Sequence, residues 1–149
     1  MSLLKSIQDG EGKTVEFKVE LPNSNTLAKT IIAFSNTGGG KLIIGVNDQG
    51  EIIGLEPDVN IFELKDKVAS IIYETCYPTV LPDIYTTTID DQLLLIIEVY
   101  RGNLLPYYLK NKGKNEGVYI RVGATNRKAS HENILELEVD ERARLGLFL

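Results

Sequence analysis

The residues best suited to chemistry are basic side chains concentrated in one part of the chain. Between residues 101 and 128 the sequence has seven basic residues and one acid, Glu116, so this segment has a net charge of +6. The seven are Arg101, Lys110, Lys112, Lys114, Arg121, Arg127 and Lys128. The whole chain has a net charge of −5, which argues against a nucleic-acid-binding protein. A local basic surface can nevertheless bind a polyanion that the whole molecule would repel.

Part of this basic segment has the pattern of a strand hairpin. The stretches 106–110 and 118–122 flank a loop rich in lysine and glycine. Alternation puts Tyr119 and Arg121 on one face, where a ring can stack on a base and a guanidinium can contact phosphate. We therefore predict that nucleic acid binds through Lys110, Lys112, Lys114, Tyr119, Arg121, Arg127 and Lys128. The alternative is that these lysines only keep a loop soluble and discourage aggregation of strand edges.

Three consecutive glycines, Gly38, Gly39 and Gly40, raise the question of a phosphate-binding loop. Such a loop follows a strand and precedes a helix, because the N–H groups and the positive dipole end of that helix hold the phosphate. Here the glycines follow a predicted helix and precede the apolar run 42–46. We therefore predict that one glycine takes a left-handed position at the helix end and the others allow a sharp reversal.

The apolar periodicity predicts a mixed α/β domain with six or seven strands and three helices. Beyond the hairpin in the basic segment, strands are expected at 14–20, 42–46, 51–54, 84–89 and 93–100. Helices are expected at 24–36 and 60–76 and from Ser130 onward. A tight turn is expected at Asp90–Asp91. In the strand 14–20, alternation places Glu16 and Lys18 on a polar face, opposite the apolar one.

Composition favours one soluble domain in a reducing compartment. The 149 residues, 43% hydrophobic and 25% charged, match ordinary globular proteins. One cysteine and one histidine allow neither an internal disulfide nor a zinc site of the Cys/His type. No apolar run approaches the ~20 residues of a membrane span, so we expect a cytoplasmic protein without a membrane partner. The apolar end at residues 143–149 suggests that more chain follows.

Three spaced motifs cover most of the chain. They are Glu11-x-x-x-Val15-Glu16-Phe17-Lys18, then Ala33-Phe34-x-Asn36-Thr37-x-Gly39-Gly40-x-Leu42-x-Ile44-Gly45-Val46-x-Asp48-x-x-Gly50-x-x-x-Gly54, and finally Val118-Tyr119-x-Arg121-x-Gly123-x-x-x-Arg127. Together they resemble the Schlafen/Alba-like domain family (Schlafen AlbA_2). The resemblance implies such a domain at residues 11–138, after a lead at 1–10 and before the start of a further region at 139–149. It implies a DNA-binding module of a bacterial or archaeal transcriptional regulator and, with the prevalence of two-fold symmetry, a homodimer.

The same resemblance implies a second class of function. In the vertebrate Schlafen branch three acidic residues form a metal-dependent RNA-cutting site, and the matching positions here are Glu11, Glu16 and Asp48. Such carboxylates can bind Mg²⁺ or Mn²⁺, activate a water and stabilise charge on a phosphoryl oxygen. Lys18, on the face of Glu16, is expected to neutralise that charge. The plain alternative is that Glu16 and Lys18 are solvated neighbours and Asp48 begins a turn.

Nucleic-acid binding is therefore the favoured function, and a metal-dependent nuclease is the alternative. An ATP-binding or ATPase domain ranks last, because the sequence has no Gly-Lys-[Ser/Thr] phosphate loop. No cofactor is expected for binding alone, whereas the nuclease would use Mg²⁺ or Mn²⁺.

Overall fold

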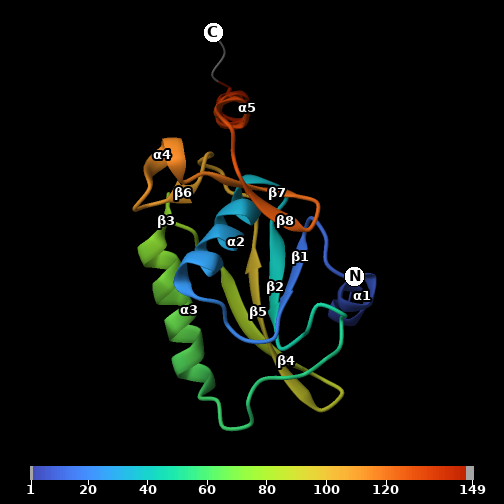
Figure 1. The fold of residues 1–149 in the computed structure, drawn as a ribbon. Coiled ribbons are helices and arrows are strands. Elements are labelled where there is room, and N and C mark those ends of the chain that lie inside the picture. Colours follow the sequence, from blue (N-terminus) through green and yellow to red (C-terminus); the bar gives the residue numbers. More distant parts are fainter. Residues whose placement is uncertain (1, 147–149) are drawn as a thin grey trace.

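The computed structural model describes residues 2–146 and is built around a four-stranded sheet (Figure 1). Its strand order is β1-β2-β5-β4, formed by β1 (Val15–Lys18), β2 (Gly40–Ile44), β5 (Gln92–Val99) and β4 (Asp83–Ile89). β1 and β2 are parallel, and the other two pairs are antiparallel. β1 and β4 are therefore the two edges of this sheet. The expectation that more chain follows the apolar end rests largely on residues 147–149, which lie outside the described residues.

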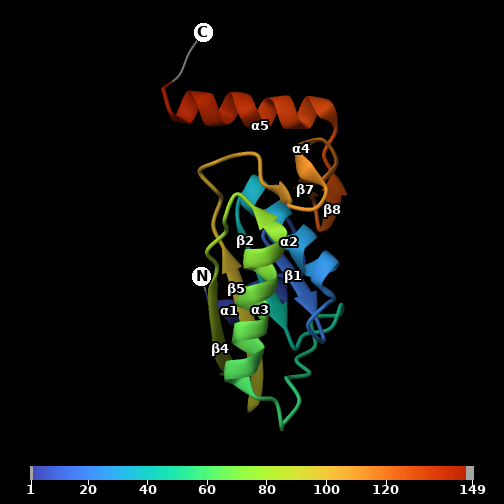
Figure 2. The same cartoon turned by 90° about the vertical axis from the view of Figure 1, so that its left-hand side faces the viewer.

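Helices lie on both faces of the sheet. Ile7 of α1 (Leu3–Asp9) packs on one face, and α2 (Ser24–Asn36) and α3 (Ile61–Thr75) cover the other. Two small two-stranded sheets adjoin α2: β3 (Cys76–Tyr77) pairs with β6 (Tyr108–Leu109), and β7 (Tyr119–Val122) pairs with β8 (Thr125–Lys128). Figure 2 shows α5 (His131–Arg144) crossing the end of the molecule beyond α4 (Gly113–Glu116). α5 runs without a break past residue 138.

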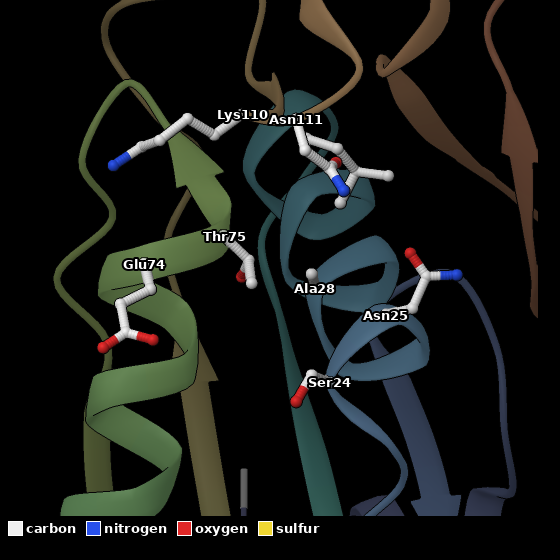
Figure 3. A pocket seen from close by; sticks show the side chains of 8 residues that line it. Ser24, Asn25, Ala28, Glu74, Thr75, Lys110 and Asn111 are labelled. Atoms are coloured by element: carbon white, nitrogen blue, oxygen red, sulfur yellow. The ribbon is translucent and has the colours of Figure 1, made fainter.

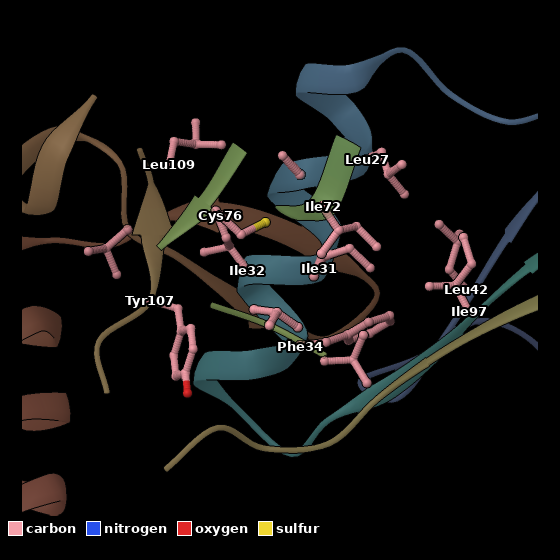
Figure 4. Close-up of a cluster of buried hydrophobic side chains, with 14 of the residues drawn as sticks. Leu27, Ile31, Ile32, Phe34, Leu42, Ile72, Cys76, Ile97, Tyr107 and Leu109 are labelled. Atoms are coloured by element: carbon pink, nitrogen blue, oxygen red, sulfur yellow. The ribbon is translucent and has the colours of Figure 1, made fainter. Parts of the chain in front are cut away.

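The core has two layers because β2 is covered on both faces. Leu42 and Ile44 face α2 and α3, whereas Ile43 faces α1, and all three are almost fully buried. A short, continuous aliphatic run is typical of such a strand. Figure 4 shows the larger layer, in which Ile31 and Phe34 of α2 meet side chains of the sheet and of α3.

The triple glycine turns the chain from α2 into β2, as the sequence predicted. Gly39 has a left-handed φ of +75°, and a Cβ there would lie 2.6 Å from the carbonyl oxygen of Val99. A Cβ on Gly40 would lie 2.5 Å from the Phe34 ring, whereas Gly38 has no neighbour closer than 3.9 Å. Two of the three positions therefore require glycine for close packing.

The predicted fold class is confirmed, but the number of elements was underestimated. The described residues form eight strands and five helices, not six or seven strands and three helices. The additional helices, α1 and α4, are only seven and four residues long, so they carry little apolar periodicity. The expected strand at 51–54 is reduced to a bridge between Ile52 and Val46.

The two predicted hairpins had different outcomes. The turn at Asp90 and Asp91 is confirmed, and both residues have the positive φ of a two-residue hairpin turn. The pairing of 106–110 with 118–122 was wrong, apart from one bridge between Tyr108 and Val118. β7 pairs instead with β8, because the chain reverses at once at Gly123, whose φ is +58°. Within residues 2–146 no helix has the length and apolar character needed to cross a bilayer.

Candidate nucleic-acid interface

The seven cations of the basic segment fall into two groups in the structure. Four of them pair with acidic side chains: Arg101 with Asp140, Lys114 with Glu138, Arg121 with Glu16, and Lys128 with Glu116. The other three, Lys110, Lys112 and Arg127, form no salt bridge among residues 2–146, although Lys112 contributes, after Lys128, to the lowered pKa of Glu116. The predicted surface of +6 is therefore much weaker, because acids from β1 and α5 neutralise part of it.

Arg121 is buried, so the prediction that it contacts phosphate was wrong. Only 3% of the residue is exposed, and its guanidinium lies 5.1 Å from the centre of the Phe34 ring. Its five N–H groups are matched by five hydrogen bonds. Two go to the carbonyl of Gly12 and one to that of Val15, while Nη1 donates to Glu16 at 2.5 Å and to Asn126 at 2.8 Å. Arg121 thus attaches the β7–β8 hairpin to β1.

Glu16 is the partner of Arg121 and lies inside the domain, 7% exposed. Its second carboxylate oxygen accepts a hydrogen bond from Thr30 of α2 at 3.1 Å, and Thr30 also accepts one from Asn126. The plain alternative, in which Glu16 is a solvated neighbour of Lys18, is wrong for Glu16, because its side chain contacts α2 and β7. A buried carboxylate is stable here because a charged partner and hydrogen bonds compensate its desolvation.

Glu11 has a structural contact at the edge of the sheet. Its Oε1 accepts a hydrogen bond from the backbone N–H of Phe17 at 2.8 Å. The carbonyl of Val15, on the same side of β1, accepts from Gly12 N–H and from Arg121. Side chains thus occupy the edge of β1, where a further strand would otherwise pair.

The acidic residues predicted to bind metal do not converge. Asp48 is exposed in a turn that is held by the side chain of Asn47, which accepts from Gln49 N–H and Glu51 N–H. Glu16 and Glu11 are engaged as described above, and Lys18 is half-buried at the end of β1. Across residues 2–146 there is no group of three Asp, Glu, His or Cys side chains that could hold a metal ion. The residues present therefore do not fit the predicted Mg²⁺ or Mn²⁺ site.

Asn36 has a central structural role that the sequence analysis missed. Its amide nitrogen donates to the carbonyls of Tyr107 and Tyr119, and its Oδ1 accepts from Tyr107 N–H at 2.7 Å. This side chain joins the end of α2 to two segments about 70 and 80 residues later in the chain. The presence of Asn36 in the second motif was the only sign in the sequence that this residue matters. Only the fold shows which backbone groups form hydrogen bonds with its side chain.

The remaining predicted binding residues lie at the surface with different surroundings. Lys29 of α2 places its ammonium 5.1 Å from the centre of the Tyr119 ring, so that ring already contacts a cation. The Lys110 ammonium lies 5.9 Å from the centre of the Tyr73 ring, and Lys112 directly precedes α4. Lys29 was missed, although its spacing of four residues from Asn25 puts both on one face of α2.

A pocket of about 440 Å³ lies between the start of α2 and the end of α3 (Figure 3). Six of its eight lining residues have polar side chains, although more of the lining surface is apolar than polar: Ser24, Asn25, Ala28, Glu74, Thr75, Leu109, Lys110 and Asn111. Figure 3 shows Lys110 reaching over the end of α3, while Asn111 lies beside α2. The volume is within the range of small-molecule sites, and the amides can both donate and accept hydrogen bonds.

Perturbed pKa values occur at structural positions and do not point to a catalytic group. Burial raises the pKa of the Cys76 thiol to about 11, so this cysteine is an unreactive core residue. The hydrogen bond from Lys128 lowers the pKa of Glu116, and the same contact raises the pKa of Lys128. This exposed pair keeps both partners charged at neutral pH.

The family of the chain follows from comparison with known proteins. A family model described as Schlafen, AlbA_2 matches residues 11–130. The chain belongs to this family. No curated protein matches it. The motifs quoted from the sequence therefore identified the family correctly, while two of their charged residues, Glu16 and Arg121, are buried.

Two solved structures share the Schlafen AlbA_2 fold. The crystal structure of the DIP2311 protein from Corynebacterium diphtheriae is similar with a TM-score of 0.62 at 23% identity, over 88% of this chain and 24% of that one. The solution structure of the N-terminal domain of a RecG-related protein from Nitrosomonas europaea has a TM-score of 0.59 at 23% identity. The match covers 85% of this chain and 90% of that one. The chain thus spans about a quarter of the Corynebacterium protein, and at this identity the likeness concerns the fold alone.

Proposed function

We propose that this Schlafen AlbA_2 domain binds nucleic acid, with DNA as the first ligand to test, as the binding module of a regulatory protein. The observation that carries the proposal is that Lys110 and Asn111 line one end of this pocket, with Lys112 next in the chain. Neither lysine forms a salt bridge among residues 2–146. Cations beside a pocket that also has the amides of Asn25 and Asn111 suit a ligand with both phosphates and polar bases.

The neighbouring surface extends this interface. Asn25 lines the pocket, and Lys29 lies on the same face of α2, four residues later. The ammonium of Lys29 contacts the Tyr119 ring. Arg127 adds an exposed guanidinium on the β7–β8 hairpin. The name of the Nitrosomonas protein relates it to an ATP-dependent DNA helicase, which supports DNA as a ligand for such a domain. Binding of this kind is directed at phosphate, so we expect it to weaken steeply with salt.

The decisive experiment is a titration of labelled duplex and single-stranded oligonucleotides. We compare the wild type with the triple variant Lys110→Ala/Lys112→Ala/Arg127→Ala, which removes the three cations that form no salt bridge. The triple variant should bind about tenfold more weakly or worse at low salt. The slope of log affinity against log salt should fall by roughly one unit for each phosphate that the variant no longer neutralises.

The matched control is the double variant Lys114→Ala/Lys128→Ala, which removes cations that already pair with Glu138 and Glu116. Its affinity should change less than that of the triple variant, because these ammonium groups are partly neutralised. Equal losses in both variants would show that binding follows total charge alone. Wild-type protein that binds neither oligonucleotide at low salt would overturn the proposal.

A further inference from the structure

The two edges of the central sheet differ in how their outward backbone groups are bonded. At the β1 edge, Glu11 accepts from Phe17 N–H, and the carbonyl of Val15 accepts from Arg121 and Gly12. This edge is also only four residues long. The β4 edge is seven residues long and pairs with β5 on one side only. An unprotected edge is a template for pairing with another strand.

The backbone groups that β4 presents outward follow from its hairpin. The two-residue turn makes Ile89 and Gln92 the closing pair, so Ile89, Thr87, Tyr85 and Asp83 direct their N–H and C=O groups toward β5. The groups of Thr88, Thr86 and Ile84 then point away from the sheet. In the described part of the chain no hydrogen bond reaches these outward groups outside the β4–β5 pairing.

The free edge of β4 lacks the usual features that prevent another strand from pairing with it. The strand DIYTTTI contains no lysine, no proline and one charged residue, Asp83, at its first position. Asp83 accepts a hydrogen bond from Tyr100 of its own chain. Proteins normally protect long edges with lysine, proline, bulges or a covering segment.

A second copy of the same strand fits this edge. If two copies pair antiparallel about a two-fold axis at Thr86, the outward residue Ile84 of one copy lies opposite Thr88 of the other. Asp83 then lies opposite Ile89, so no like charges face each other. Such pairing is self-complementary, as a two-fold interface requires.

Exposed apolar side chains adjoin the same edge. Leu81, just before β4, is 84% exposed, and Tyr73 on α3 is 65% exposed. Both line a groove of about 430 Å³ that also includes Ile84 of β4. Strand pairing alone buries less area than a stable dimer needs, and these side chains supply additional apolar surface beside it.

We infer that the β4 edge is the association surface for a second copy of this chain, which joins the two sheets into one of eight strands. The inference is independent of nucleic-acid binding. Its first test is sedimentation equilibrium combined with amide hydrogen exchange at low and high protein concentration. A dimer should form as concentration rises, and the amide of Thr86 should become protected only in the dimer. The amides of Tyr85 and Thr87, bonded to β5, should be protected at both concentrations.

A variant tests the same surface by a second route. Thr86→Pro removes the outward N–H that would donate twice across the axis, once from each copy, and proline is tolerated where the N–H faces outward. The dimer should dissociate about thirty-fold more readily, while the monomer keeps its circular dichroism spectrum. Protein that stays monomeric at all concentrations, or a dimer in which Thr86 exchanges as fast as in the monomer, would overturn the inference.

Discussion

The basic segment contains two kinds of cation that look alike in sequence and differ in the fold. One is Arg121, which is enclosed by five hydrogen bonds in a buried junction with Glu16, Thr30 and Asn126. The other is the group of outer cations, Lys110, Lys112 and Arg127, which form no salt bridge in the described chain. Charge alone does not distinguish them. The difference teaches that two arginines of the same motif can have different roles, because Arg121 holds the hairpin in place whereas Arg127 is exposed.

The buried junction should dominate stability. Arg121→Met leaves Glu16 buried without its charged partner, and breaking a buried ion pair on one side costs about 3–5 kcal/mol. Arg127→Met is the matched control, because it changes the same residue type on the same hairpin at an exposed position. Its effect on the free energy of unfolding should stay within about 0.5 kcal/mol. Urea unfolding of both variants measures the difference, and equal stabilities would remove the contrast between the two kinds of cation.

Asn36 should be the next most sensitive position outside the ion pair. Asn36→Ala leaves the N–H of Tyr107 and the carbonyls of Tyr107 and Tyr119 without this partner, and we expect a loss of about 2–3 kcal/mol. Asn25→Ala on the same helix is the control, since Asn25 is exposed. Thermal or urea unfolding should separate the two clearly. Similar midpoints would mean that the end of α2 is held by apolar packing alone.

Substitutions of the glycines should change the free energy of unfolding by a smaller amount, and they test packing without changing any charge. Gly40→Ala brings a Cβ against the Phe34 ring, on which Arg121 also lies, and overpacking of this kind costs about 1–3 kcal/mol. Gly38→Ala meets no atom closer than 3.9 Å and should be neutral within about 0.5 kcal/mol. If Gly38→Ala proved the more harmful change, the assignment of these glycines to chain reversal and close packing would be wrong.

The sequence predicted well those features that depend on local patterns. The aliphatic run of β2, the caps of α3 and α5, and the turn at Asp90 and Asp91 all have short-range signals, and the structure contains each of them. The order of helix, glycines and strand likewise excluded a phosphate loop, because the helix end that meets the glycines has the wrong polarity. The spaced motifs named the family because many positions had to agree at once.

The predictions failed where long-range contacts decide. Period-two alternation correctly separated Glu16 from Phe17, but it could not show that both faces of β1 are covered. Arg121 lies 105 residues from Glu16, and nothing local indicates that they meet. The loop between 106 and 122 looked like a hairpin because its flanks alternate, yet the nearer partner after Gly123 formed the strand pair. Polar residues in a motif can therefore serve the framework as readily as the ligand.

The most direct test of the central claim is a double-mutant cycle on the buried junction. It compares the wild type, Glu16→Gln, Arg121→Met and the double variant by urea unfolding. Because the two side chains share one network, the double variant should be more stable than the sum of the single effects predicts, with a coupling of about 1–3 kcal/mol. Additive effects, with a destabilisation by Arg121→Met as small as that by Arg127→Met, would show that Arg121 is a free surface cation and would contradict the account.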